Sequence, residues 1–346
     1  MMGFIWFWIV AVMIAAYVVF DGFDLGAGIL YLFLGRSEED RATLIQSIGP
    51  VWDGNEVWLL AGGGTLFFAF PQLYASSFSG FYLPLIIVLW LLIMRGLGIE
   101  LRGHIQNDLW RTLFGGLFTI SSILLAVFYG AALANVIRGV PLDAQHSFFL
   151  PLWTNWQVGP HPGILDWYTV IGGLVALVAL AMHGGLWVAL KTTGGLSERA
   201  SRAAGIAWGL VCAMTLISLI ATIAVQPLSL QNYRTWPVLD VIPAAVVVSL
   251  AGIEILRRQK KVLASFLASC AYLTFMLVGA AAGLYPILLP SSTSAETDLT
   301  VANSLAGPYS LHVGLIWWGI GMALAVGYFV TSYWLFRGKA EGHYHI

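Results

Sequence analysis

Charged residues and cysteines are both scarce in this sequence. Only 10% of its 346 residues are Asp, Glu, Lys or Arg, whereas 59% are hydrophobic. That is too little polar surface to cover a water-soluble particle of this length, and the formal charge of -1 gives no sign of a nucleic-acid partner. The two cysteines, Cys212 and Cys270, lie in apolar runs without metal-ligand spacing, which argues against a disulfide and a thiolate metal site.

Long apolar runs are what the sequence has instead. Each is about 20 residues or longer, enough for a helix to cross a hydrocarbon core roughly 30 Å thick. The nine runs cover approximately residues 4–33, 51–70, 78–98, 113–135, 164–190, 204–225, 238–256, 262–289 and 308–336. We therefore predict an all-α polytopic integral membrane protein, a bundle of nine transmembrane helices that forms one transmembrane domain over residues 1–346.

Lys and Arg are distributed unevenly between the connections. Of the 16 in the chain, 14 follow the first, third, fifth, seventh or ninth predicted helix, and only Arg138 and Arg234 lie in the alternate connections. The positive-inside rule then predicts an N-terminus outside the cell and a C-terminus in the cytoplasm.

Four carboxylates lie inside predicted spans: Asp21 and Asp24 in DGFDLGAG, and Asp53 and Glu56 in GPVWDGNEVWLL. An ionised carboxylate at the bilayer centre costs roughly 2.5 to 3.5 kcal/mol on insertion scales, so these groups must be protonated, paired or hydrated. Buried acids of this kind are typical of proton routes and ion sites.

The spacing of the acids groups them in two pairs. Asp21 and Asp24 share a helix face, and the glycines around them leave room for a second helix or for water. Asp53 and Glu56 share a face near the cytoplasmic start of their helix, where an acid pair tends to share a proton. The alternative is structural: the first pair caps, kinks or ties helices together, and Asp53 stabilises a helix N-terminus.

Arg95 and Glu100 end the third predicted helix at one level. They form either the mouth of a hydrophilic passage or an ion pair at the membrane interface. Trp52 and Trp58 bracket the second acid pair, where they either wall a narrow passage or fill the core.

Histidine gives no metal signal. None of the seven histidines makes a ligand spacing such as HExxH within a helix, and only His183 and His312 lie near membrane depth. We expect both histidines to be structural residues that form hydrogen bonds. We predict no catalytic, cofactor-binding or metal-binding residue in this chain.

Four segments together resemble subunit II of cytochrome bd-type quinol oxidases. They are DGFDLGAG, then GPVWDGNEVWLL, then MRGLGIELR (94–102) and LYPILLPSST (284–293). The order and spacing of these segments span nearly the whole chain.

The resemblance implies a haem-free subunit of an electrogenic quinol:O2 oxidoreductase, the terminal oxidase of an aerobic respiratory chain, in the bacterial plasma membrane. Its partner, subunit I, would hold two haem b and one haem d, oxidise quinol and reduce O2 to water. Small single-helix accessory subunits, membrane lipids and a lipid or quinone bound to this subunit are further expectations.

The resemblance also assigns roles to residues of this sequence. It implies a cytoplasmic proton route through these acids and a neighbouring tryptophan: Asp53, Asp24, Asp21, Glu100, Glu56 and Trp52. Trp58 matches a tryptophan next to an apolar path for O2. Arg95 is assigned to the inlet or to charge pairing from its position alone and not from the resemblance.

Two other functions are consistent with buried acids in glycine-rich helices. One is a proton-coupled secondary transporter, which would usually show an inverted repeat and no haem partner. The other is a purely structural assembly subunit, whose acids only bind subunit I.

Overall fold

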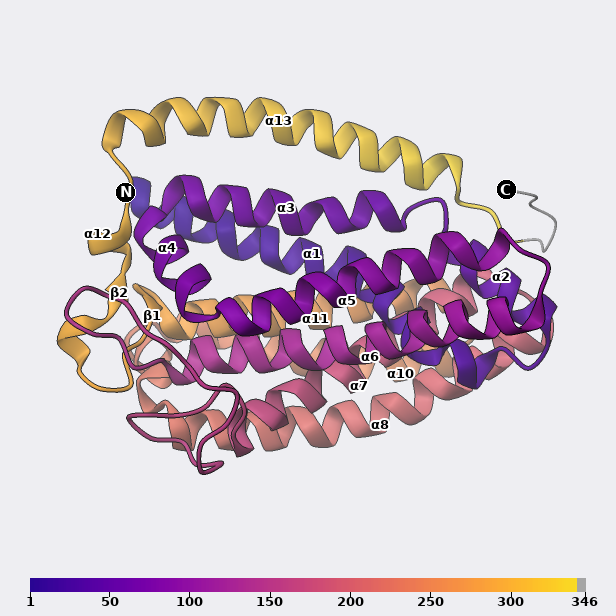
Figure 1. Cartoon of the computed structure of the whole chain (residues 1–346), viewed down its shortest axis with the longest axis horizontal. Helices are drawn as coiled ribbons and strands as arrows, with labels where there is room; N and C mark the ends of the chain where they lie inside the picture. The colour runs from indigo at the N-terminus through magenta and orange to yellow at the C-terminus, as the bar shows by residue number, and fades with distance from the viewer. Residues whose placement is uncertain (341–346) are drawn as a thin grey trace.

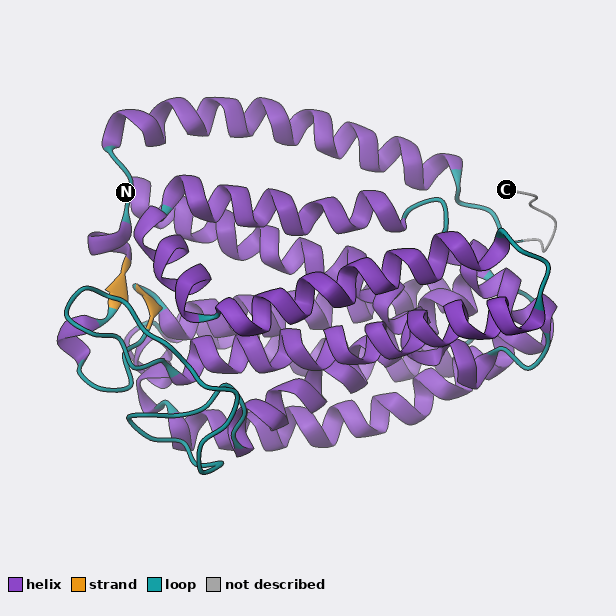
Figure 2. Ribbon diagram, viewed as in Figure 1, coloured by secondary structure: helices purple, strands orange, loops and turns teal. Residues whose placement is uncertain are grey.

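The computed structural model describes residues 1–340 as long helices that run side by side, with most loops gathered at one end (Figure 1, Figure 2). The helices of 18 residues or more are α1 (Met2–Leu34), α3 (Trp52–Ala69), α5 (Tyr82–Glu100), α6 (Asp108–Arg138), α7 (Trp167–Lys191), α8 (Gly194–Val225), α10 (Val241–Arg258), α11 (Val262–Leu284) and α13 (Pro308–Leu335). Residues 341–346, which include the predicted cytoplasmic C-terminus and the end of the predicted domain, lie outside the described part.

Short elements connect the long helices. They are α2 (Glu38–Ile48), α4 (Pro71–Gly80), α9 (Gln231–Thr235), α12 (Val301–Ser304) and the 3-10 turns Leu101–Gly103, Pro227–Leu230, Pro237–Asp240 and Ala295–Thr297. Strands β1 (Ile287–Leu289) and β2 (Leu299–Thr300) pair antiparallel at the loop-rich end (Figure 2).

The predicted all-α membrane architecture is confirmed. Within residues 1–340, eight helices are long and apolar enough to cross a membrane, and they include every long helix except α3. Asp53, Asn55 and Glu56 lower the hydropathy of the first turns of α3, although α3 packs along α1 (Figure 1). The count of nine spans and the orientation of the termini therefore stay predictions.

Helix α1 lies at the centre of the bundle in its second half. Every residue from 21 to 29 is buried, because α3, α6, α7 and α11 all pack against this helix. Its 33 residues extend about 50 Å, so the helix is longer than the hydrocarbon core is thick.

Two glycines bring the backbones of α1 and α7 into direct contact. A methyl group at Gly26 would lie 2.0 Å from the carbonyl oxygen of Leu180, and one at Gly184 would lie 2.2 Å from the carbonyl carbon of Gly26. Close approach of this kind is the usual way in which small residues drive helix association in membranes, and here it encloses the acidic stretch of α1.

Helix α13 lies along the outside of the bundle beyond α3 (Figure 1). Leu311 is its only buried residue, and most of its side chains are exposed in the isolated chain. After its last turn the chain is tied to the end of α7, where the Lys191 ammonium donates to the carbonyl oxygens of Phe336 and, at 2.8 Å, Gly338.

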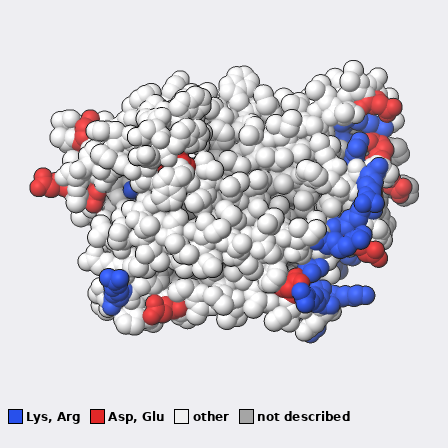
Figure 3. Space-filling model, turned by 90° about the horizontal axis from the view of Figure 1, so that it is seen from below, with Lys and Arg blue, Asp and Glu red and all other residues white. Residues whose placement is uncertain are grey.

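Most Lys and Arg side chains gather at one end of the bundle, the end that carries α2 (Figure 3). We call this the basic end. There Asp40 accepts from the Arg199 guanidinium at 2.6 Å and caps α2 together with Ser37. Burial opposes ionisation of Asp40, but hydrogen bonds from Arg199 and from the backbone N–H of Ser37 outweigh it and hold the pKa of this carboxyl below its ordinary value.

The contact between α1 and α7 predicts that Gly184→Ala destabilises the assembled protein. Because the new methyl group meets backbone and not a movable side chain, we expect a loss of about 1–3 kcal/mol. Thermal unfolding of the purified complex measures the change. Gly209→Ala on α8, where no atom lies within 4 Å of the added methyl, is the matched control. Equal stability of the two variants would contradict the packing described here.

The lowered pKa of Asp40 predicts how α2 responds to pH. Asp40→Asn removes the ion pair with Arg199, so the amides of α2 should exchange several-fold faster, equivalent to less than about 1 kcal/mol. A lowered folded-state pKa means that the stabilisation is complete above the ordinary Asp value of about 3.9 and is lost only below it. Hydrogen exchange should therefore show the same difference at pH 7 and pH 5. A difference that fades over this range would contradict the assignment.

Candidate functional site

Arg95 and Asp21 form an ion pair inside the bundle. Both side chains are fully buried. Nη1 of Arg95 donates to Oδ2 of Asp21 at 2.8 Å, and Nη2 donates to Oδ1. Such a two-pronged contact satisfies the geometry of both groups and leaves the pair with no net charge. Arg95 thus pairs with Asp21 and not with Glu100, which is exposed at the end of α5 and makes no ion pair among the described residues.

Asp24 is equally buried but has no cation of its own. Its Oδ2 accepts from Nδ2 of Asn55 on α3 at 2.8 Å, whereas Oδ1 has no hydrogen-bond partner within residues 1–340. The charges of Asp21, Arg95 and Glu56 all act on this carboxyl. A buried polar atom without a partner is costly, so Oδ1 of Asp24 is where a proton or a water molecule would be stabilised.

Asn55 is a residue of this site that charge alone does not reveal, although the chain carries a signal for it. The buried face of α3 is Asn55, Trp58, Gly62, Thr65 and Ala69, a helical spacing of three and four that places the amide on the face toward α1. A neutral side chain between Asp53 and Glu56 draws little attention when only charges are counted.

Asp53 and Glu56 lie on the outer and lateral faces of α3. Asp53 is exposed in the isolated chain and Glu56 is half-buried, and neither side chain makes a hydrogen bond to another described residue. The charges of Arg95, Asp21 and Asp53 act on Glu56. The four acids with Arg95, which we call the acidic cluster, are therefore graded in burial from the surface of α3 to the centre of α1.

The two tryptophans of α3 differ in position. Trp52 is half-buried and packs against Gly96 of α5. Trp58 is buried and stacks on Phe20, with ring centroids 5.7 Å apart, and it also contacts Phe329 of α13. Trp58 thus fills an aromatic layer between α1, α3 and α13, and its place beside a path for O2 stays a prediction.

The two histidines at membrane depth differ in their surroundings. His183 is fully buried, with Nδ1 within 2.7 Å of Ser269 Oγ and Nε2 within 3.0 Å of the carbonyl oxygen of Val19. His312 is exposed and bonds to the Pro308 carbonyl. No group of three or more metal-ligating side chains occurs in the part of the chain that was described. Both ring nitrogens of His183 are thus occupied by hydrogen bonds, so this histidine does not fit a haem ligand as it is placed.

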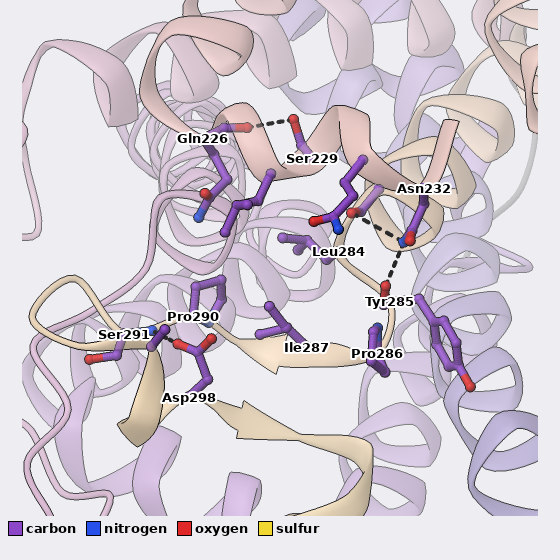
Figure 4. A pocket seen from close by; sticks show the side chains of 14 residues that line it. Gln226, Ser229, Asn232, Leu284, Tyr285, Pro286, Ile287, Pro290, Ser291 and Asp298 are labelled. Atoms are coloured by element: carbon purple, nitrogen blue, oxygen red, sulfur yellow. Dashed lines mark hydrogen bonds between the residues drawn. The ribbon is translucent and has the colours of Figure 1, made fainter. Parts of the chain in front are cut away.

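A cavity of about 220 Å³ lies at the loop-rich end of the molecule, opposite the basic end. It is enclosed by the end of α8, α9 and β1 (Figure 4). Its polar groups are largely paired: Asn232 donates to the carbonyl oxygen of Ala282 at 2.8 Å, and Asp298 accepts from the backbone N–H of Ser291 at 2.6 Å. Burial raises the pKa of Asp298 above its ordinary value. None of the predicted site residues lines this cavity, so it is separate from the acidic cluster.

Comparison with known proteins identifies the family. The model of the cytochrome bd terminal oxidase subunit II family matches residues 2–336. The chain belongs to this family. It is therefore a subunit of a membrane terminal oxidase, a multi-pass membrane protein with a subunit I as its partner, in a complex that contains haem.

Relatives cover almost the whole chain. Cytochrome bd ubiquinol oxidase subunit 2 of Bacillus subtilis is 31% identical over 341 residues, covering 97% of this chain and 96% of that protein. Cytochrome bd-I ubiquinol oxidase subunit 2 of Escherichia coli is 30% identical over 366 residues, covering 97% and 94%. A chain in the structure of bd oxidase from Geobacillus thermodenitrificans has the same fold, with a TM-score of 0.77 at 16% identity over 97% of this chain and 99% of that one.

The buried ion pair predicts a non-additive pair of mutations. Arg95→Gln should destabilise the protein by about 3–5 kcal/mol because it leaves Asp21 charged and unpaired. Adding Asp21→Asn should restore most of that loss. Thermal unfolding of the purified complex gives both values.

Arg258→Gln is the control for this cycle. Arg258 pairs with Glu254 at 2.6 Å but its side chain is 74% exposed, so its loss should cost less than about 1 kcal/mol. A double variant as unstable as Arg95→Gln alone would contradict a coupled pair.

Proposed function

We propose that this chain is the haem-free subunit of a quinol:O2 oxidoreductase and supplies the cytoplasmic proton route to the site of O2 reduction. Subunit I then carries two haem b and one haem d and oxidises quinol, in the plasma membrane of a bacterium. The observation that supports the route is the graded acidic cluster, which begins at exposed Asp53 and ends at buried Asp24 with an unpaired oxygen.

The route follows from what each group is able to do. Asp53, at the start of α3 beside Trp52, takes a proton from the aqueous side, and Glu56, one turn further, receives it. Arg95 donates to both oxygens of Asp21, so neither oxygen is free to take part in proton transfer. Asp24, which lacks a cation, is the group that binds and releases the proton next to the bundle centre. Glu100, exposed at the end of α5, contributes negative charge near the inlet.

The route explains how charge is separated without a pump. Reduction of O2 to water consumes protons, and oxidation of quinol releases them. If the consumed protons come from the cytoplasm and the released ones leave on the other side, turnover is electrogenic. Only a conduit is then required of this subunit, with no redox group of its own.

The expected O2 path and the expected contacts of α13 are supported by fewer observations than the proton route. Trp58 and Phe20 provide an apolar layer beside which O2 would diffuse from the lipid. Exposed α13 offers an apolar surface to subunit I, to a single-helix accessory subunit, or to a bound lipid or quinone. We also propose that the whole chain, residues 1–346, forms a single transmembrane domain.

A purely structural assembly subunit is the alternative that the geometry also supports. The Asp21–Arg95 pair and the Asp24–Asn55 contact would then only hold α1, α3 and α5 together. Membership in an oxidase-subunit family favours both of these readings over a proton-coupled transporter.

Asp53→Asn separates the two functions. A proton route through Asp53 predicts that O2 consumption falls at least about ten-fold, equivalent to ~1.4 kcal/mol on the barrier, while haem content stays normal. An oxygen electrode and an absorption spectrum of the purified complex measure both. Glu198→Gln, an exposed acid at the basic end outside the cluster, is the control. Full turnover of Asp53→Asn would reject the route, whereas loss of haem or of the complex would favour the assembly role.

A further inference from the structure

Asn55 links three helices through one buried amide. Its side chain is fully buried on α3. Nδ2 donates to Oδ2 of Asp24 on α1 at 2.8 Å, and Oδ1 accepts from the hydroxyl of Tyr333 on α13 at 2.9 Å. Tyr333 is half-buried, and this is its only side-chain hydrogen bond within residues 1–340. The contact thus joins the most exposed long helix to a fully buried acid.

The amide distinguishes the two oxygens of Asp24. Oδ2 is occupied by an N–H donor, whereas Oδ1 has no partner among the described residues. A carboxyl oxygen that bears a proton is itself a donor. A proton on Oδ2 would therefore bring two donors together in a buried place, while a proton on Oδ1 leaves Oδ2 as the acceptor that Asn55 requires.

Ionised Asp24 sets the orientation of that amide, and Tyr333 holds it there. Because a carboxylate only accepts, the N–H group of Asn55 faces Asp24, and the Tyr333 hydroxyl donates to Oδ1 on the other side of the amide. If the amide turned over, its carbonyl oxygen would face the acceptor oxygens of Asp24, and ionised Asp24 would lose the one donor it has among the described residues. A buried charge that loses a hydrogen bond is destabilised considerably.

We propose that Asn55, held by Tyr333, is a positioning residue that keeps Oδ2 of Asp24 occupied and so directs the transported proton to Oδ1. Asn55 carries no proton itself, since a carboxamide is neither an acid nor a base under these conditions. The proton binds to Oδ1 and leaves from Oδ1, and the amide contact is the same in both states. This inference rests on the proton route proposed above.

Infrared difference spectroscopy of the working oxidase tests the contact directly. Protonated Asp24 should give a carboxyl C=O band, which Asp24→Asn removes. In the native protein the C=O group is Oδ2 and accepts from Asn55, so its stretching frequency is lowered. Asn55→Leu, which has a similar volume, should move the band to higher frequency and slow O2 consumption about ten-fold or more with normal haem content.

Tyr333→Phe removes one hydroxyl and tests whether Tyr333 holds the amide in place. We expect the Asp24 band to broaden, because the amide loses the hydrogen bond to Tyr333 and becomes more mobile, and turnover to fall by less than in Asn55→Leu. Tyr328→Phe is the matched control. It removes a hydroxyl from the same helix, five residues away, that makes no hydrogen bond to a described residue.

The outcomes separate this inference from the proton route. Wild-type turnover in Asp24→Asn, or the absence of any band that depends on Asp24, would overturn both, because a carboxyl that carries no proton needs no positioning. Slow turnover in Asp24→Asn together with an unshifted band and normal turnover in Asn55→Leu would overturn only the role of Asn55.

Discussion

The ion pair between Asp21 and Arg95 is the interaction on which the rest of this structure depends. A lone carboxylate at the centre of α1 would oppose membrane insertion, and a lone guanidinium on α5 would do the same. Joined by two hydrogen bonds, the two groups form a neutral unit that the apolar bundle is able to enclose. Because Arg95 is already committed to Asp21, Asp24 one turn away is left without a cation, and this difference gives two acids of one helix face different chemistry.

The packing around α1 maintains that difference. Gly26 and Gly184 allow α7 to touch the backbone of α1, so water is excluded on that side. On the side of α3, polar groups replace apolar ones over the first turns, from exposed Asp53 to buried Asn55. Close backbone packing at Gly26 on one side and a polar helix on the other make the α3 side of α1 the side along which the proposed route would run.

Much of the fold follows from composition and patterning. Runs of apolar residues predict the long helices well, since hydrophobic length is a strong signal. The helices begin and end within three residues of the predicted bounds, except at one end of each of the runs 78–98, 113–135, 204–225 and 262–289, which differ by four to ten residues. The predicted span at 51–70 is the weakest case, because Asp53 and Glu56 reduce the hydropathy of α3.

The candidate site was less predictable than the fold. Charge and spacing identified Asp21, Asp24 and Arg95 as unusual, but they did not reveal that Arg95 pairs with Asp21. That contact depends on the rotation of α5 relative to α1, which intrahelical spacing leaves undetermined. Asn55 was missed because its importance comes from Tyr333, 278 residues further along the chain. Contacts between distant neutral groups leave no local pattern.

The separation of 74 residues between Asp21 and Arg95 has a consequence for biosynthesis. At a translation rate of roughly 5–20 residues per second, the ribosome adds Asp21 about 4–15 s before it adds the arginine that pairs with it. During that interval the nascent α1 carries unpaired acid in its second half, whereas its first half is strongly apolar. Until α5 is made, Asp21 has no arginine partner and is accommodated only hydrated or protonated, so the pairing that neutralises it follows the synthesis of α5.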